Sequence, residues 1–181
     1  MKWAAEIVLT FVFFMASCAM VFANQGGSFC LAGKEAVFFQ KDFKEIRSFG
    51  MIALSLVGDA EKIGLDEHEL TAHVKELFKT YFVGIAYDDV SKNSKKFWDL
   101  VSTRDKKVGN ITFRVWVVGD DFPVAYHIKC DAGNFDNPAI WTDEILGHGS
   151  KKTAPGAIRE ILDEMVRDLA ANFFKARAQA M

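Results

Sequence analysis

Apolar positions between residues 51 and 87 predict a strand, a helix and a second strand. Residues 51–57 are an apolar run ended by a Gly-Asp pair, which is typical of a buried strand. The helix begins after Asp66, an N-cap residue with Glu69 three positions later as its capping-box partner. Five residues then form one apolar stripe at helical spacing: Leu70, Val74, Leu77, Phe78 and Tyr81. Residues 82–87 are expected to form the next strand.

Strict alternation over residues 109–131 predicts a β-hairpin. One face takes Ile111, Phe113, Val115 and Val117, and the return strand adds Val124, Tyr126, Ile128 and Cys130 to it. The other face takes Thr112, Arg114, Trp116 and Val118, with Ala125, His127 and Lys129 from the return strand. Residues 119–121 make the turn, and Pro123 restricts the start of the second strand.

The rest of the chain predicts short edge strands and a second long helix. Residues 36–39 and 46–49 are short apolar pieces suited to edge strands, and residues 139–146 are a further strand candidate. Pro155 opens a helix whose buried stripe has six members: Ile158, Ile161, Leu162, Met165, Leu169 and Phe173. Residues 88–107, between the expected strand at 82–87 and the hairpin, are polar and Lys-rich, with enough apolar side chains for a short helix.

These elements predict an α+β fold. We expect a two-layer sandwich, with a mainly antiparallel sheet and two long amphipathic helices on one face, because each helix has a single apolar stripe. A doubly wound parallel sheet is the weaker alternative, since the hairpin joins its strands too tightly for crossover helices.

The N-terminal segment, residues 1–23, has the pattern of a signal peptide. Lys2 precedes an uncharged, mostly apolar run, and small residues near Ala23 suit cleavage there. A retained anchor helix is a second interpretation, although the run is shorter than the roughly 20 residues that span a bilayer. Lipidation at Cys18 is a third, but Met15 stands where such motifs usually have Leu, and the apolar run continues beyond the cysteine. We expect a periplasmic or secreted protein, with membrane contact only if this segment is retained or lipidated.

Composition refines this picture of an exported domain. Residues 24–33 contain three Gly and are expected to be flexible, which leaves residues 34–181 as a single domain. The formal net charge of -2 indicates no nucleic-acid partner. Two cysteines remain after cleavage, Cys30 and Cys130, and in an exported chain they are expected to form one disulfide. The alternative is two isolated buried thiols, because the sequence does not show that they lie within bonding distance.

Motifs for chemistry are weak along the whole chain. His68 and His73 are five apart, whereas helix residues that share a metal ion are three or four apart, so we expect no metal site. Residues 147–150 lack the order of a nucleophile elbow and of a phosphate loop. The Asp-Asp pairs at 88–89 and 120–121 are typical of turns and lack the spacing of an EF-hand. No cofactor motif is present, and catalytic residues are not assigned.

The second face of the predicted hairpin is the candidate binding surface. Arg114, Trp116, His127 and Lys129 point away from the helices, and Trp141 is expected to join them from the next strand. If the helices cover one face only, this surface is exposed, aromatic and cationic, which is typical of partner or ligand sites. The alternative is that residues 88–107 simply cover it.

Short motifs link the chain to exported bacterial proteins. Residues 63–70 (Ile-Gly-Leu-Asp-Glu-His-Glu-Leu) resemble a G-L-[acidic or hydroxyl]-x-x-x-L helix start, followed by a Trp-bearing strand at 139–142 and an acidic helix at 158–172. Over about residues 50–175 the chain thus resembles a family of uncharacterised exported bacterial proteins. Its layout is similar to that of auxiliary envelope subunits of ABC-type transporters. The resemblance implies a non-enzymatic periplasmic role, although the Lys-rich segment departs from the compact pattern.

The leading functional hypothesis is therefore an exported, non-catalytic binding or accessory protein that acts on an envelope protein or a small ligand. One alternative is a secreted hydrolase that uses the loop around His148, and another is a purely structural envelope component.

Overall fold

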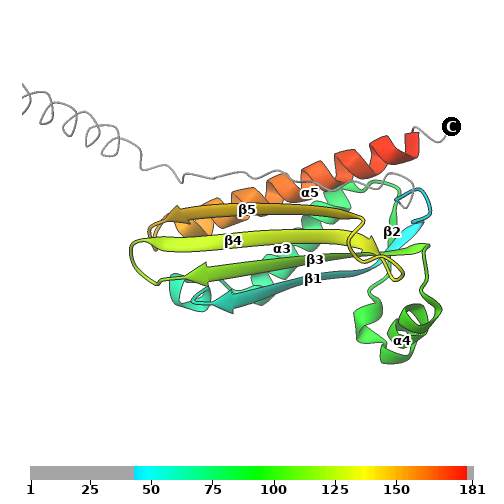
Figure 1. The fold of residues 1–181 in the computed structure, drawn as a ribbon, viewed down its shortest axis with the longest axis horizontal. Helices are drawn as coiled ribbons and strands as arrows, with labels where there is room; N and C mark the ends of the chain where they lie inside the picture. Colours follow the sequence, from blue (N-terminus) through cyan, green and yellow to red (C-terminus); the bar gives the residue numbers. More distant parts are fainter. Residues whose placement is uncertain (1–42, 179–181) are drawn as a thin grey trace, which may run out of the picture.

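The computed structural model describes residues 43–178, whose strands form one mixed five-stranded sheet (Figure 1). The strands are β1 (Ser48–Gly58), β2 (Ala86–Tyr87), β3 (Val108–Val118), β4 (Val124–Asn134) and β5 (Trp141–Gly149). Their order across the sheet is β2-β1-β3-β4-β5. β1 runs parallel to both β2 and β3, whereas β3, β4 and β5 are antiparallel neighbours. The sheet therefore has a parallel half and an antiparallel half.

Two long helices cover one face of this sheet. α3 (Glu67–Tyr81) packs on β1 and on α5 (Ala154–Ala178), which also contacts β4 and β5. In Figure 1 both helices lie behind the strands. α4 (Ser94–Thr103) stands at one end of the sheet, next to a short 3-10 turn at Val90–Lys92. The predicted α+β sandwich with two helices on one face is confirmed.

The start of α3 follows the predicted capping pattern. The Asp66 carboxylate accepts a hydrogen bond from the Glu69 backbone N–H at 2.7 Å, which satisfies one of the free donors of the first turn. Leu70, Val74 and Phe78 are the buried members of the apolar stripe. At the other end, the Phe82 N–H donates to the Phe78 carbonyl at 2.8 Å. Because this bond keeps Phe82 with the helix, the predicted strand at 82–87 shrinks to Ala86–Tyr87.

Phenylalanine rings fill the core between β1, α3 and α5. The aromatic cluster consists of Phe49, Phe78, Phe82 and Phe173, all of which are nearly or fully buried. Phe78 and Phe82 stack at 4.4 Å between ring centroids, and Phe49 meets both edge-on at 5.2 and 5.4 Å. These edge-to-face and stacked contacts add to the area that the rings bury. One cluster thus holds the sheet to both long helices.

The β3–β4 hairpin has the predicted alternation. Its core-facing residues are buried: Ile111, Phe113, Val115, Val117, Val124, Tyr126, Ile128 and Cys130. The register places Phe113 opposite Cys130 and Trp116 opposite His127. At the neighbouring end of β1, Gly58 has φ +78, and a Cβ there would lie 2.2 Å from the Val117 carbonyl oxygen. Only glycine allows the chain to turn this close to β3.

No disulfide is seen at Cys130, which is a free thiol within the described part of the chain. Its side chain is fully buried on the helix-covered face of β4, and burial raises its pKa well above the ordinary value. Cys130 therefore contributes to the core as a small apolar side chain. Cys30 lies outside the described residues.

Several expectations concern parts of the chain that the structure does not describe. The signal segment 1–23 with Cys18, the segment 24–33 and the candidate strand 36–39 all precede residue 43. Within residues 43–178, no helix is long and apolar enough to span a membrane.

A half-buried ion pair connects α3 to the segment after β2. Lys75 Nζ lies 3.0 Å from Asp89 Oδ2, and the second carboxylate oxygen accepts the Ser91 backbone N–H at 3.2 Å. Burial alone would raise the pKa of Asp89, but the hydrogen bonds from Ser91 and Lys75 outweigh it and lower the pKa from 3.8 to about 2. The ionised form of Asp89 is therefore stabilised by folding.

Replacement of Asp89 by asparagine is expected to lower the free energy of unfolding by roughly 2 kcal/mol at neutral pH. Because the folded pKa lies below 3.8, the contribution of Asp89 is present above that value and disappears as the pH falls through about 2. Urea unfolding between pH 7 and pH 2 measures both effects. The D89N protein should show a flatter acid limb, and the matched change Asp88→Asn, at a mostly exposed carboxylate, should alter neither quantity. Equal curves for D89N and the wild type would contradict this assignment.

Candidate functional site

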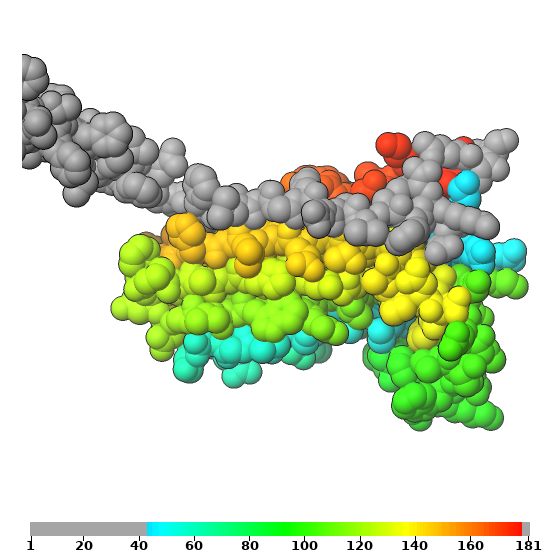
Figure 2. Space-filling view, in the orientation of Figure 1, coloured from blue at the N-terminus to red at the C-terminus, as the bar shows by residue number. Residues whose placement is uncertain are grey.

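Within residues 43–178, the face of the sheet opposite α3 and α5 is largely uncovered, and we call it the open face. It is turned toward the viewer in Figures 1 and 2. Figure 2 also shows α4 as a lobe at one end of the sheet, so the segment 88–107 leaves most of this face uncovered. Sequence alternation supplies its side chains: Ser55 and Val57 from β1; Thr112, Arg114, Trp116 and Val118 from β3; Ala125, His127, Lys129 and Asp131 from β4; Thr142, Glu144, Leu146 and His148 from β5.

Four of the five candidate residues lie on this face. Trp116 stacks on His127 with ring centroids 5.0 Å apart and an interplanar angle of 16°. Lys129 Nζ lies 3.4 Å from Glu144 Oε1, and His127 Nε2 lies 3.3 Å from Glu144 Oε2. Arg114 is exposed and forms no ion pair with any described acidic residue. Their placement agrees with the predicted alternation, and their role in binding stays a prediction.

Trp141 does not belong to this group, and the expectation that it joins the open face is wrong. It is 1% exposed and pairs with Ala132, which is also buried in the core. The alternation of β5 therefore turns Trp141 and Ile145 toward the helices and Glu144 and Leu146 toward solvent. Among the described residues, the Trp141 indole N–H has no hydrogen-bond partner.

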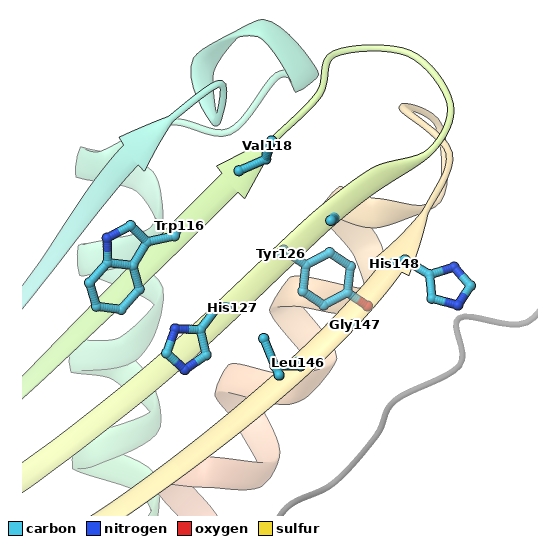
Figure 3. A pocket seen from close by; sticks show the side chains of 8 residues that line it. Trp116, Val118, Tyr126, His127, Leu146, Gly147 and His148 are labelled. Atoms are coloured by element: carbon cyan, nitrogen blue, oxygen red, sulfur yellow. The ribbon is translucent and has the colours of Figure 1, made fainter.

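A shallow apolar groove of about 380 Å³ lies on the open face near the β3–β4 turn (Figure 3). Its walls are Trp116, Val118, Ala125, His127, Leu146 and His148, and Tyr126 and Gly147 complete it. Figure 3 shows Trp116, His127 and Leu146 on three neighbouring strands. Val118 and Leu146 are 69% and 57% exposed. A surface with this many exposed apolar atoms in one place is typical of an interaction site.

Among the described residues, the side chains that line the groove beside its histidines are aromatic or aliphatic. None of the residues that line it is a serine, a cysteine or a carboxylate. His148 lies on β5 opposite Ala125 rather than in a loop. The nearby Ser150 accepts the Thr153 backbone N–H at 3.2 Å, at the start of α5. In the described part of the chain, no serine or cysteine side chain lines the groove beside His148.

The other candidate ligands for a metal have structural contacts. His73 Nε2 lies 2.6 Å from Asp163 Oδ1 and so connects α3 with α5. Asp88 pairs with Lys96, and Asp89 pairs with Lys75. Within the described part of the chain, no group of three or more His, Cys, Asp or Glu residues is placed to hold a metal ion.

A second cavity, also of about 380 Å³, lies where the open face meets α4, and we call it the α4 cavity. β1, β3 and β4 contribute Met51, Asn110, Thr112, Arg114, Asp131 and Asn134; α4 contributes Phe97 and Val101; the β4–β5 connection contributes Phe135, Pro138 and Ala139. Sequence reasoning found only Arg114 of this set. A polar Asn110 at the start of an apolar strand is the one local indication of the site.

No protein-family model matches the chain, and no curated protein matches it. The resemblance to exported bacterial proteins therefore stays a prediction. Among solved structures, the chain is similar to the PelC dodecamer from Paraburkholderia phytofirmans, with 6% identity, a TM-score of 0.42, and coverage of 81% of this chain and 97% of that one. It is also similar to the dodecamer of a PelC variant from the same organism, with 10% identity, a TM-score of 0.42, and coverage of 80% and 99%. The likeness concerns the course of the backbone alone.

Proposed function

We propose that the protein is an exported, non-catalytic binding module that holds a partner protein of the cell envelope in the apolar groove. The observation that carries the proposal is the stack of Trp116 on His127, beside the exposed Leu146, on a sheet face that the helices leave uncovered. Export is inferred from the signal-like segment 1–23, which would place the partner outside the cytoplasm.

The lining of the groove favours a protein over a small ligand. Small-molecule sites usually add a few fixed polar groups to an apolar pocket, because these groups orient the ligand. Here no residue that lines the groove is an Asp, Glu, Lys or Arg, and its polar side chains are His127, His148 and Tyr126. Exposed aromatic and aliphatic side chains in a shallow depression instead suit the apolar side chains of a partner protein.

Charged residues next to the groove suit the border of such an interface. Lys129, Glu144 and Asp131 form a band of mixed charge across β4 and β5, with 3.4 and 3.5 Å between Lys129 Nζ and the two carboxylates. Interfaces commonly surround an apolar centre with polar groups that remain accessible to water. Val57, which pairs with Trp116 on the open face, is 42% exposed and extends the apolar surface past the groove.

Replacing Leu146 by glutamate is expected to weaken partner binding at least about tenfold, because a charge would be buried against the apolar partner. A photo-crosslinking residue at position 146 of the full chain, in its native envelope, would identify the partner. Calorimetry with that purified partner would then compare the wild type and L146E. The matched control is Val83→Glu, at an apolar residue that is 75% exposed and lies outside the groove.

Three outcomes would overturn the proposal. The crosslink at position 146 could form only between copies of this chain, or with no protein at all. Alternatively, L146E could bind the identified partner as tightly as V83E does. Unfolding curves for both variants should lie close to that of the wild type, since both sites are on the surface.

A further inference from the structure

The walls of the α4 cavity are held in place by their own contacts. Phe97 and Phe135 meet edge-on with ring centroids 5.9 Å apart. The Phe135 N–H donates to the Asp105 carbonyl at 3.0 Å, which ties the β4–β5 connection to the segment after α4. The Asn134 amide oxygen accepts the Asp136 and Asn137 N–H groups at 2.9 and 2.7 Å. The cavity is therefore preformed, as small-molecule sites usually are.

Asn110 offers a buried polar group to this cavity. Its side chain is on the same strand face as Thr112 and Arg114, it lines the cavity, and the residue is only 4% exposed. Among the described residues, the Asn110 side chain makes no hydrogen bond. Asn110 is not one of the described residues whose side-chain polar atoms are both sealed from solvent and unpaired, so its amide reaches the cavity and can donate and accept hydrogen bonds there. A ligand in the cavity could therefore bond to this amide directly.

Two opposite charges border the cavity without pairing with each other. Arg114 and Asp131 are diagonal neighbours on β3 and β4, because Asp131 stands opposite Thr112, two residues from Arg114. No ion pair joins them. One Asp131 oxygen accepts the Thr142 hydroxyl at 2.8 Å and lies 3.5 Å from Lys129 Nζ. The other oxygen makes no contact with a described polar side chain, so each group retains bonding capacity toward the cavity.

We propose that the α4 cavity binds a free α-amino acid with an apolar side chain. The guanidinium of Arg114 matches the planar geometry of a carboxylate. The free oxygen of Asp131 and the Asn110 amide oxygen accept bonds from the ammonium group. The rings of Phe97 and Phe135 provide an apolar wall for the side chain. A ligand with only one charge would leave unused either the Arg114 guanidinium or the second oxygen of Asp131, which favours the zwitterion.

Calorimetry on protein purified from cells expressing the full 181-residue chain tests this assignment. L-Phenylalanine and L-leucine should bind saturably with dissociation constants below about 1 mM. 3-Phenylpropanoate lacks the ammonium group and 2-phenylethylamine lacks the carboxylate, so both should bind at least about tenfold more weakly. Equal affinity of either analogue, or no saturable heat up to about 10 mM amino acid, would overturn the proposal.

Two variants separate binding from folding. Arg114→Gln should weaken amino-acid binding at least about tenfold, whereas Arg159→Gln, at an arginine paired with Glu69 outside the cavity, should not change it. Asn110→Ala should weaken binding while leaving the melting temperature close to that of the wild type, because the amide reaches the cavity and has no hydrogen-bond partner among the described residues. A lower melting temperature for N110A, with unchanged affinity, would show that Asn110 has a structural role instead.

Discussion

Replacement of Phe173 by alanine is expected to lower the free energy of unfolding by about 3–5 kcal/mol, because it leaves a large void among tightly packed rings. The Phe173 ring is fully buried and lies 5.5–5.6 Å from the rings of Phe43, Phe49 and Phe82. It thus connects α5 to β1 and to the end of α3. Urea unfolding followed by circular dichroism measures the loss.

The neighbouring ring on the same helix is the matched control. Phe174 is 37% exposed and meets Phe82 at 6.1 Å, so Phe174→Ala should cost less than half as much as Phe173→Ala. Equal losses for the two variants would mean that α5 is rotated relative to the sheet, and the position of the aromatic cluster would be wrong.

Trp141→Ala is expected to destabilise the protein by about 3–5 kcal/mol, whereas Trp116→Ala should cost about 1 kcal/mol or less. Trp141 is 1% exposed on the helix side of β5, while Trp116 is partly exposed on the open face. Unfolding of each variant in urea compares the two directly. If W116A unfolded as readily as W141A, Trp116 would be a core residue and the proposed binding surface would be lost.

A milder change at position 141 tests the indole nitrogen itself. Trp141→Phe keeps an aromatic ring and removes the buried N–H that has no partner among the described residues. The gain from removing this group offsets part of the lost volume, so we expect a cost below about 1.5 kcal/mol. A cost equal to that of W141A would indicate that the N–H is hydrogen-bonded in solution.

The sequence predicted those parts of the fold that depend on residues close together in the chain, such as helix caps and strand alternation. The Asp66 cap and the alternation around Phe113 and Trp116 depend on residues close in sequence, and the structure confirms both. The parallel pairing of β1 with β3 was beyond such reasoning, because the two strands are joined through α3 and α4 and their register depends on packing.

The expectation that Trp141 lies on the open face was wrong because the sequence of β5 does not show which of its two faces is buried. A strand shows its inner face clearly only when apolar and polar residues alternate, and β5 carries Asp143 on the core side and Leu146 on the open side. The pairing of Trp141 with Ala132 decides which face of the sheet Trp141 occupies, and this register depends on the neighbouring strand β4. For Cys130, in contrast, the alternation of the strand predicted the correct face. Its alternation with Ile128 already placed it in the core, where the structure has a free thiol.

The candidate sites differ in the same way. Trp116 and His127 face each other in a hairpin, so the alternation of two adjacent strands was enough to bring them together. The α4 cavity requires Met51, Phe97, Asn110 and Phe135, which come from four separate segments. Only the assembled fold places these side chains around one space.

The split between an antiparallel and a parallel half also has a kinetic consequence. β3, β4 and β5 follow one another along the chain, so their pairing closes short loops, whereas β1 pairs with β3 only after some 50 residues have been ordered. We therefore expect the three-stranded meander to form early and β1 with α3 to join it late. The walls of the apolar groove all belong to the meander, while the α4 cavity also needs Met51 and Phe97. During folding, the surface for a partner protein would thus exist before the pocket for a small ligand.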